Sequence, residues 1–339
     1  MNLLKNLVFV MFIVLLAGCG EEAGVSSSPT PKEGEKITIG FIVKQPEEPW
    51  FQMEHRFARE ASKEHGFELM ELAGTDSEKV LSLIDNLGVK GAKGLLICTP
   101  DVKLGPAIMS RAEKYGLKVI AVDDRFIGND GKFMENVHYL GIAGKEIGKD
   151  VGAELYKEMQ KRGWDVKDTG VAMITFHELD TAKDRTDGAA EALIAAGFPK
   201  EQIYLAPQKT SDIKGSLEAT DILLVQKPGV KHWLVAGMND SAVLGAIRSM
   251  EARGFSPKDV CGIGINGTDC IGELEKREAT GFYGSMLLQA KKHGYDTATM
   301  MYRWIKEGVE PPLDTRTRGI LITRDNFREI LREQGFEGI

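Results

Sequence analysis

The chain has 339 residues, of which 42% are hydrophobic and 27% are charged, and its formal net charge at pH 7 is −7. An acidic surface without a basic stripe argues against nucleic acid and anionic lipid as partners. The length suits two domains of ordinary size, and after the N-terminus no apolar run reaches the roughly 20 residues that a spanning helix needs.

The first nineteen residues have the layout of a secretory signal peptide, with Lys5, an apolar core at 7–16 and Leu-Ala-Gly-Cys ending at Cys19. The core is too short for a stable spanning helix. Leu-Ala-Gly-Cys resembles the lipobox of bacterial lipoproteins, in which the cysteine is diacylated and becomes the new N-terminus. The alternative is an ordinary signal peptide that contains a cysteine. We expect residues 1–19 to be the signal and Cys19 to anchor the exported protein to the outer face of a membrane.

Residues 20–35 (GEEAGVSSSPTPKEGE) are rich in Ser, Pro, Gly and Glu and are too polar to form a core. We expect them to be a flexible tether. Beyond it, the chain contains Cys98, Cys261 and Cys270, without a CxxC pair. An odd number in an exported protein favours free or buried thiols, so we expect no metal site and no catalytic cysteine.

The body of the chain alternates β-rich runs with longer helical patterns, and a helix near 145–162 separates two series of strands. Near-continuous apolar strands that alternate with helices predict a parallel sheet covered on both faces. The expected strands are 37–44, 67–73, 94–100 and 118–124 in the first series and 169–176, 202–208, 232–239 and 259–266 in the second.

The two series also resemble each other. KGLLICTPD…LG (93–105) matches KHWLVAGMND…LG (231–245), and KVIAVDD (118–124) matches DVCGIGIN (259–266). This repeat predicts an α/β protein with two similar doubly wound, Rossmann-like lobes. Ligands of such sheets bind beyond the carboxyl ends of the strands, so two facing lobes would surround one cleft.

Charged, amide and aromatic side chains follow the expected strands of both lobes, and no histidine stands in an obvious catalytic relation to them. Taken singly, an Asp or Asn in such a place is more often a surface charge, a turn former or a helix N-cap. Their coincidence in both lobes predicts a polar small-molecule cleft. From the first lobe they are Lys44, Glu48, Trp50, Phe51, Cys98, Asp123 and Asp124, and from the second Thr181, Arg185, Met238, Asn239 and Asn266.

A monosaccharide fits this inventory. Its hydroxyl groups both donate and accept hydrogen bonds, which suits Asp, Asn and Arg, and charged partners contribute roughly 1.5–3 kcal/mol each. Its apolar C–H faces suit an indole ring such as that of Trp50. Pro46 and Pro49 would fix the backbone on both sides of Glu48 before the ligand arrives.

Several long motifs resemble the L-arabinose-binding proteins, a family of type I periplasmic solute-binding proteins that serve sugar ABC transporters. The resemblance extends from about Lys36 to Phe336. It is carried by VKQPEEPWF, LLICTPD, VIAVDD, ELDTAKDRT, GMNDS, GIGING and GFYGS, together with YKEMQKRGWDV and LITRDNF.

The resemblance implies a role for each matching residue. The sugar would be hydrogen-bonded by one set and stacked on Trp50, Asp123 would orient its neighbours, and Glu48 and Asp269 would contribute directly or through water. The hydrogen-bonding set is Lys44, Asp124, Arg185, Asn239 and Asn266, and the pocket lining is Phe51, Cys98, Leu179, Thr181 and Met238.

The resemblance also implies three crossovers between the lobes. The first lobe would comprise 36–142 plus 289–317 and the second 143–288 plus 318–339. We expect a monomer without cofactor that closes on a sugar and delivers it to an ABC permease. The expected sugar is L-arabinose, with D-galactose and D-fucose as alternatives. Two departures bear on the choice of sugar: Leu288 replaces a proline near the hinge, and Ile142 replaces a methionine of the pocket. The lipobox departs too, because soluble members of the family lack it.

Two other classes of function compete with this one. Gly262, Gly264 and Gly267 fit G-x-G-x-x-G, but they lie in a late strand and no acid ends the next one, which disfavours a dinucleotide enzyme. The adjacent pairs 47–48 and 123–124 are poorly placed for glycoside hydrolysis, because neighbours on one strand end seldom face each other across a bond. A sensor that presents sugar to a chemoreceptor or kinase is the remaining alternative to transport.

Overall fold

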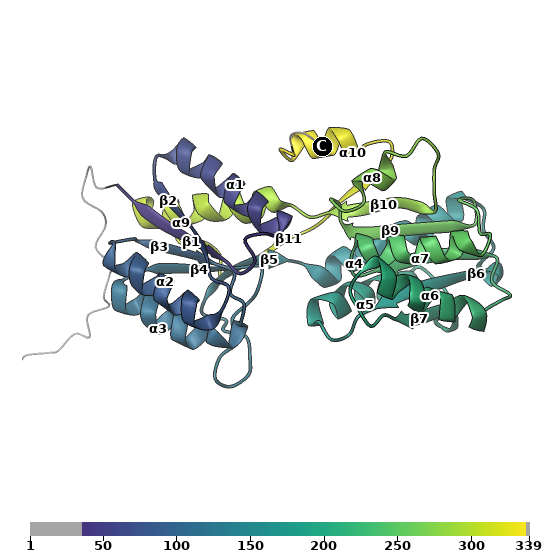
Figure 1. Ribbon diagram of the computed structural model, residues 1–339, viewed down its shortest axis with the longest axis horizontal. Coiled ribbons are helices and arrows are strands. Elements are labelled where there is room, and N and C mark those ends of the chain that lie inside the picture. Colours follow the sequence, from purple (N-terminus) through teal and green to yellow (C-terminus); the bar gives the residue numbers. More distant parts are fainter. Residues whose placement is uncertain (1–35, 337–339) are drawn as a thin grey trace, which may run out of the picture.

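The computed structural model describes residues 36–336, which form two α/β lobes side by side along the long axis of the molecule (Figure 1). Each lobe is built on one six-stranded sheet. The predicted class, two doubly wound lobes with largely parallel sheets, is confirmed. The predicted signal peptide, Cys19 and the predicted tether lie outside the described residues, and no described helix is long and apolar enough to cross a membrane.

The first sheet has the strand order β11-β5-β4-β3-β1-β2 and is parallel throughout. Its buried strands are rich in Ile, Leu and Val, as a sheet covered on both faces requires. Its strands are β1 (Thr38–Val43), β2 (Glu68–Ala73), β3 (Gly94–Ile97), β4 (Lys118–Val122), β5 (His138–Ile142) and β11 (Asp314–Thr317).

The second sheet has the order β12-β10-β9-β8-β6-β7, and only β12 runs antiparallel to its neighbour. β3 and β8 hold the same place in their sheets, as do β4 and β9, so the repeat in the sequence corresponds to a repeat in the fold. Its strands are β6 (Thr169–Thr175), β7 (Ile203–Pro207), β8 (His232–Gly237), β9 (Val260–Asn266), β10 (Phe282–Leu287) and β12 (Ile320–Thr323).

Helices cover both faces of each sheet. In the first lobe α1 (Pro49–His65) and α9 (Thr297–Glu307) pack on one face, and α2 (Ser77–Val89) and α3 (Gly105–Tyr115) on the other. In the second lobe the pairs are α4 (Gly144–Lys161) with α5 (Asp180–Ala195), and α6 (Ile213–Gln226) with α7 (Asp240–Ala252). The shorter pieces are η1 (Val102–Leu104), η2 (Val166–Asp168), η3 (Lys200–Gln202), α8 (Ile271–Leu274), the π-helical turn η4 (Lys292–Asp296) and α10 (Phe327–Glu333).

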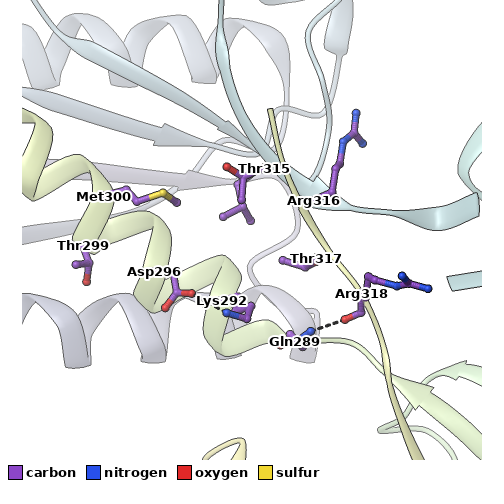
Figure 2. A pocket seen from close by; sticks show the side chains of 10 residues that line it. Gln289, Lys292, Asp296, Thr299, Met300, Thr315, Arg316, Thr317 and Arg318 are labelled. Carbon is purple, nitrogen blue, oxygen red and sulfur yellow. Dashed lines mark hydrogen bonds and ion pairs between the residues drawn. The ribbon is translucent and has the colours of Figure 1, made fainter. Parts of the chain in front are cut away.

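The chain passes between the lobes three times. It leaves the first sheet after Ile142, returns after Leu287 and leaves again after Thr317. Figure 2 shows the last two crossovers beside each other, where the Gln289 side-chain amide donates a hydrogen bond to the carbonyl oxygen of Arg318 over 2.5 Å. The residue limits of the two lobes stay a prediction.

The C-terminal tail returns to the first lobe. After α10, the ring of Phe336 packs edge-on against Phe57 of α1, with ring centroids 6.4 Å apart. The Arg56 guanidinium donates a hydrogen bond to the carbonyl oxygen of Gly335. The tail that follows β12 and α10 therefore contacts α1 as well as its own lobe.

Candidate functional site

An ion pair lies at the strand ends of the first lobe. The Lys44 ammonium, just after β1, is 2.5 Å from the carboxylate of Asp124, just after β4. The Cys98 thiol after β3 lies 3.2 Å from the same carboxylate oxygen. Burial by itself lowers the pKa of Lys44, but the neighbouring Cys98 and Asp124 raise it above the ordinary lysine value. Lys44 therefore stays protonated at neutral pH and can donate to a ligand oxygen.

The aromatic residue of this half-site, Trp50, lies in the first turn of α1. Pro49 occupies the first turn of α1 and exposed Glu48 is its N-cap, although the Glu48 side chain makes no capping hydrogen bond. Proline suits this position because its missing N–H is not needed there. The indole of Trp50 in the same turn donates from Nε1 to Asp123 over 2.9 Å. This contact is consistent with the predicted role of Asp123 as an orienting partner. Phe51 is buried, and its ring centroid lies 5.9 Å from the Lys44 ammonium.

Arg185 dominates the half-site of the second lobe. It lies on α5, and its Nη1 donates to the carbonyl oxygen of Met238 over 2.6 Å. Within the described residues its buried Nε has no hydrogen-bond partner. Burial lowers the pKa of Arg185, and only Asp240 counteracts that shift. The guanidinium therefore retains donor capacity for a ligand.

The two predicted asparagines lie at the ends of β8 and β9: Asn239 comes just after β8, and Asn266 is the last residue of β9. Asn239 is the N-cap of α7, where its side-chain oxygen accepts from the backbone N–H of Ala242 over 2.9 Å. Its amide nitrogen remains for a ligand. The Asn266 amide donates to exposed Asp269 over 3.2 Å. Leu179 and Thr181, at the start of α5, are exposed.

Two predicted site residues have left-handed backbone conformations. Within 36–336, only Asp123 and Asn266 among the non-glycine residues have positive φ, at 62° and 125°. Asp123 follows β4, and Asn266 is the last residue of the equivalent strand β9. Such conformations cost free energy and are concentrated at functional sites. Their occurrence at matching places in both lobes supports these strand ends as the site.

A cavity of about 480 Å³ lies where the lobes meet. The predicted residues Asp123, Asp124 and Thr181 line it, together with Ile142. No hydrogen bond or ion pair between described residues joins the group around Lys44 to the group around Arg185. The structure thus places the predicted residues in two separate groups, one in each lobe, and does not bring all of them into one pocket. The Trp50 ring packs against buried clusters of both lobes.

Sequence reasoning missed three residues behind Trp50. His293 in η4 contacts Asp123, and Glu54 in α1 and Thr317 at the end of β11 lie next to the His293 ring. Of the residues that the structure describes, Glu54, Asp123 and His293 are the group whose atoms, all within 4.8 Å of one another, could hold a metal ion. The only available signal was Glu54, a carboxylate four residues after Trp50 on the same face of an otherwise apolar helix side.

The comparisons with known proteins agree with this architecture. The family model for periplasmic binding proteins and the sugar-binding domain of the LacI family matches residues 36–330. The chain is 52% identical over 328 residues to the L-arabinose-binding periplasmic protein of Escherichia coli, covering 96% of this chain and 99% of that protein. It is 44% identical to the ABC transporter L-arabinose-binding periplasmic protein of Azospirillum brasilense, covering 88% and 90% of the two chains.

A solved structure shows the same fold at lower identity. The periplasmic ribose ABC transporter protein of Conexibacter woesei superposes with a TM-score of 0.73 at 20% identity, over 88% of this chain and 95% of that one. At this identity the match supports the two-lobed fold alone.

Proposed function

Because the chain belongs to the family of periplasmic binding proteins and sugar-binding domains of the LacI family, and is related to the L-arabinose-binding proteins, we propose that it is an extracytoplasmic sugar receptor. In this proposal it captures L-arabinose between its lobes and delivers the sugar to an ABC importer. It is a binding protein and not an enzyme, as its family indicates. The observation that carries the proposal is the pair of polar half-sites at the strand ends of the two lobes.

The half-sites offer complementary chemistry to one sugar ring. The first lobe supplies a paired cation and anion, Lys44 and Asp124, and the indole of Trp50. The second supplies donors on Arg185 and the amides of Asn239 and Asn266. A hydroxyl group can accept from the lysine while it donates to the aspartate, so both charges are used by one neutral ligand.

Closure of the lobes completes the site in this proposal. With the lobes as they stand, the two half-sites have no direct bond to each other. In this proposal neither half-site encloses a sugar alone. A ligand that bridges them stabilises the closed arrangement by its contacts to both lobes. The closed arrangement would present a surface from both lobes to a permease, and the receptor is proposed to act as a monomer.

The preferred sugar is a further part of the proposal. L-arabinose and D-galactose have the same ring configuration and differ at the carbon-5 substituent, as D-fucose also does. Ile142 lines the inter-lobe cavity, and Leu288 is buried at the second crossover. Both differ from the pattern of the L-arabinose-binding proteins. We place L-arabinose first because two relatives, at 52% and 44% identity, are named for it.

The proposed location is outside the cytoplasm, as for the periplasmic relatives. We further propose that Cys19 carries a lipid that holds the receptor near its permease, connected through the tether at 20–35. Mass spectrometry of the membrane fraction tests this: a diacylglyceryl-modified Cys19 peptide supports the anchor. A mature chain released into the soluble fraction, with cleavage elsewhere than before Cys19, contradicts it.

Calorimetry with a panel of aldoses tests the binding function. We expect one site for L-arabinose, with weaker binding of D-galactose and D-fucose. D-xylose, which matches L-arabinose except at carbon 4, should bind at least tenfold more weakly, because the inverted hydroxyl leaves buried groups unpaired. Absence of binding of L-arabinose, D-galactose and D-fucose at millimolar concentration would overturn the proposal.

Uptake of labelled L-arabinose separates transport from sensing. Cells that lack this gene should lose uptake at low sugar concentration and regain it with the wild-type gene. Unchanged uptake, with loss of a chemotactic or transcriptional response, would assign the protein to a sensor instead.

A further inference from the structure

His293 is completely buried and connects the sugar half-site to the hinge. It lies in η4, five residues after Leu288 of the second crossover. Its Nδ1 is 2.6 Å from a carboxylate oxygen of Asp123, and its Nε2 is 2.8 Å from the Thr317 hydroxyl oxygen. The His293 and Trp50 rings meet edge to face with centroids 5.1 Å apart. One imidazole therefore contacts the orienting carboxylate, the stacking indole and the third crossover.

The partners of the ring indicate that both nitrogens carry protons. The Asp123 carboxylate can only accept, so Nδ1 must donate. The Thr317 hydroxyl lies 3.5 Å from the carbonyl oxygen of Gly141 in β5 and can donate there while it accepts from Nε2. Burial by itself lowers the pKa of His293, but Asp123 and Glu54 raise it to about 9.

The charges around His293 balance inside the first lobe. Burial alone raises the pKa of Asp123, yet the charge and hydrogen bond of His293 hold it below its usual value. Glu54, whose Oε1 is 3.5 Å from the imidazole Nδ1, has its pKa raised well above the usual range by burial and by Asp123. His293 and Asp123 thus stabilise each other as a buried cation and anion.

All three crossovers meet at this network. His293 follows the second crossover, Thr317 precedes the third, and Gly141 is next to the last residue of β5, before the first. Figure 2 shows Thr317 on its crossover beside the helical turn that carries Lys292, the residue before His293. A displacement of any crossover would therefore reach Asp123 through hydrogen bonds of buried groups.

We propose that His293 is a positioning residue, which fixes Asp123 and the Trp50 indole relative to the point where the three crossovers leave the first lobe. The inference rests on the proposed sugar-binding function. Holding the indole before the ligand arrives lowers the ordering cost of binding, and anchoring it to the hinge keeps it aligned with the half-site of the second lobe. His293 itself need not touch the sugar.

Two substitutions separate the hydrogen bonds of the ring. In His293→Asn the amide nitrogen can take the place of Nδ1 and keep the contact with Asp123. In His293→Gln it takes the place of Nε2, so the contact with Asp123 is lost. We expect His293→Gln to weaken L-arabinose binding at least tenfold and His293→Asn to recover part of that loss. The matched control is His65→Gln, another imidazole near a threonine hydroxyl, 3.2 Å from Thr299, at the end of α1.

Nuclear magnetic resonance without sugar tests the positioning directly. In wild type at pH 7.5 we expect the ring of His293 to show two protonated nitrogens, assigned by their loss in His293→Gln. The indole N–H signal of Trp50, assigned with Trp50→Phe, should shift in His293→Gln and stay in His65→Gln. A His293 ring without a proton on Nδ1 at this pH, or an unmoved Trp50 signal, overturns the inference.

The pH profile of binding supplies a second readout. As the pH rises through about 9, loss of the His293 proton should weaken sugar binding by wild type, and His293→Asn should lack this step. The ionisable groups around the ring are Glu54 of α1 and Asp123 after β4, with Lys44, Cys98 and Asp124 next to them.

The outcomes distinguish the inference from the function. If wild type binds none of the aldoses, the proposed function fails, and the sugar-free spectra still decide the role of His293. If wild type binds but folded His293→Gln binds within twofold of it, the inference fails alone. If His293→Gln does not fold, the wild-type ring signals, assigned by their loss in His293→Asn, and the pH profile give the decision.

Discussion

The Lys44 ammonium and the Asp124 carboxylate form a 2.5 Å ion pair across the width of one strand. They follow β1 and β4, which are separated in the sheet by β3. The Cys98 thiol at the end of β3 contacts the same carboxylate. The pair therefore stands ready before any ligand binds, with donor and acceptor a fixed distance apart.

Lys44→Met should weaken L-arabinose binding at least tenfold, about 1.4 kcal/mol. It removes the donor and leaves Asp124 without its cation. The control is Lys36→Met, which breaks a surface pair with Glu68 at 3.6 Å, with side chains 68% and 49% exposed. Such pairs contribute little, so affinity and stability should change little there. Isothermal calorimetry measures the L-arabinose affinity of both variants. Equal affinities would show that Lys44 does not contribute to the site.

Trp50→Ala should also cost at least tenfold in affinity, because the sugar loses its apolar surface. Trp50→Phe should lie between, since it keeps a flat ring but lacks the N–H that bonds to Asp123 over 2.9 Å. If Trp50 lies against the sugar, the change in intrinsic fluorescence on sugar addition should be lost in Trp50→Phe. Wild-type affinity in Trp50→Ala would mean that the stacking surface is elsewhere.

Arg185→Ala tests the second lobe separately. We expect at least a tenfold loss of affinity, about 1.4 kcal/mol, because the guanidinium is the charged donor of that half-site. The control is Arg253→Ala, an arginine on the far end of α7 that pairs with Asp221 at 3.3 Å. Affinity should fall in the first variant only. If it falls in neither, the ligand is bound by the first lobe alone.

Local sequence predicted the two lobes, and it predicted polar residues at the strand ends, because both signals are local. Apolar runs mark the strands, and a polar residue just after a run lies at the strand end whatever the rest of the fold. The repeat between 93–105 and 231–245 likewise places β3 and β8 at equivalent positions. The family resemblance then assigned Asp123 its orienting role, which the contact with Trp50 matches.

The residues behind the site carried no local signal. His293 is 170 residues from Asp123 and 24 from Thr317 in the sequence, and it follows no strand of the predicted series. Only the return of the chain through the second and third crossovers brings these residues together. The contact of Phe336 with Phe57 was missed for the same reason. How closely the half-sites approach depends on the hinge, which no single motif encodes.

Close packing of α4 on α5 gives a further prediction. A side chain at Gly148 of α4 would place its Cβ 2.0 Å from the backbone oxygen of Arg185. Gly148→Ala should therefore destabilise the fold by about 1–3 kcal/mol through overpacking. It should also weaken sugar binding, because α5 must move and carries the guanidinium with it. Urea unfolding and calorimetry measure the two effects.

The control for this change is Gly272→Ala. Apart from its neighbours in the chain and the backbone of its own helix, no heavy atom of the described residues lies within 4 Å of a Cβ built at this glycine of α8, so stability and affinity should be retained. If Gly148→Ala is as stable as Gly272→Ala and binds sugar as wild type does, α4 and α5 do not approach each other as closely as described.

The buried carboxyl group of Asp240 predicts a pH effect on stability. Its oxygens accept from the Ser285 hydroxyl over 2.5 Å and from the Gly267 backbone N–H over 2.9 Å. Burial nevertheless raises its pKa from 3.8 to about 7. Between these values the folded chain binds a proton at Asp240 and the unfolded chain does not. The contribution of this group to stability therefore falls as the pH rises from about 4 to about 7, and is constant above that.

Asp240→Asn removes this titration while keeping a side chain of nearly the same shape. The free energy of unfolding of both proteins is measured in urea at pH 5 and pH 8. The variant carries a constant offset, which cancels when the difference between the proteins is compared at the two pH values. We expect wild type to lose roughly 1–4 kcal/mol relative to the variant on going from pH 5 to pH 8. A difference independent of pH would show that Asp240 is ionised in the folded protein throughout this range, held by its two hydrogen bonds against the cost of burial.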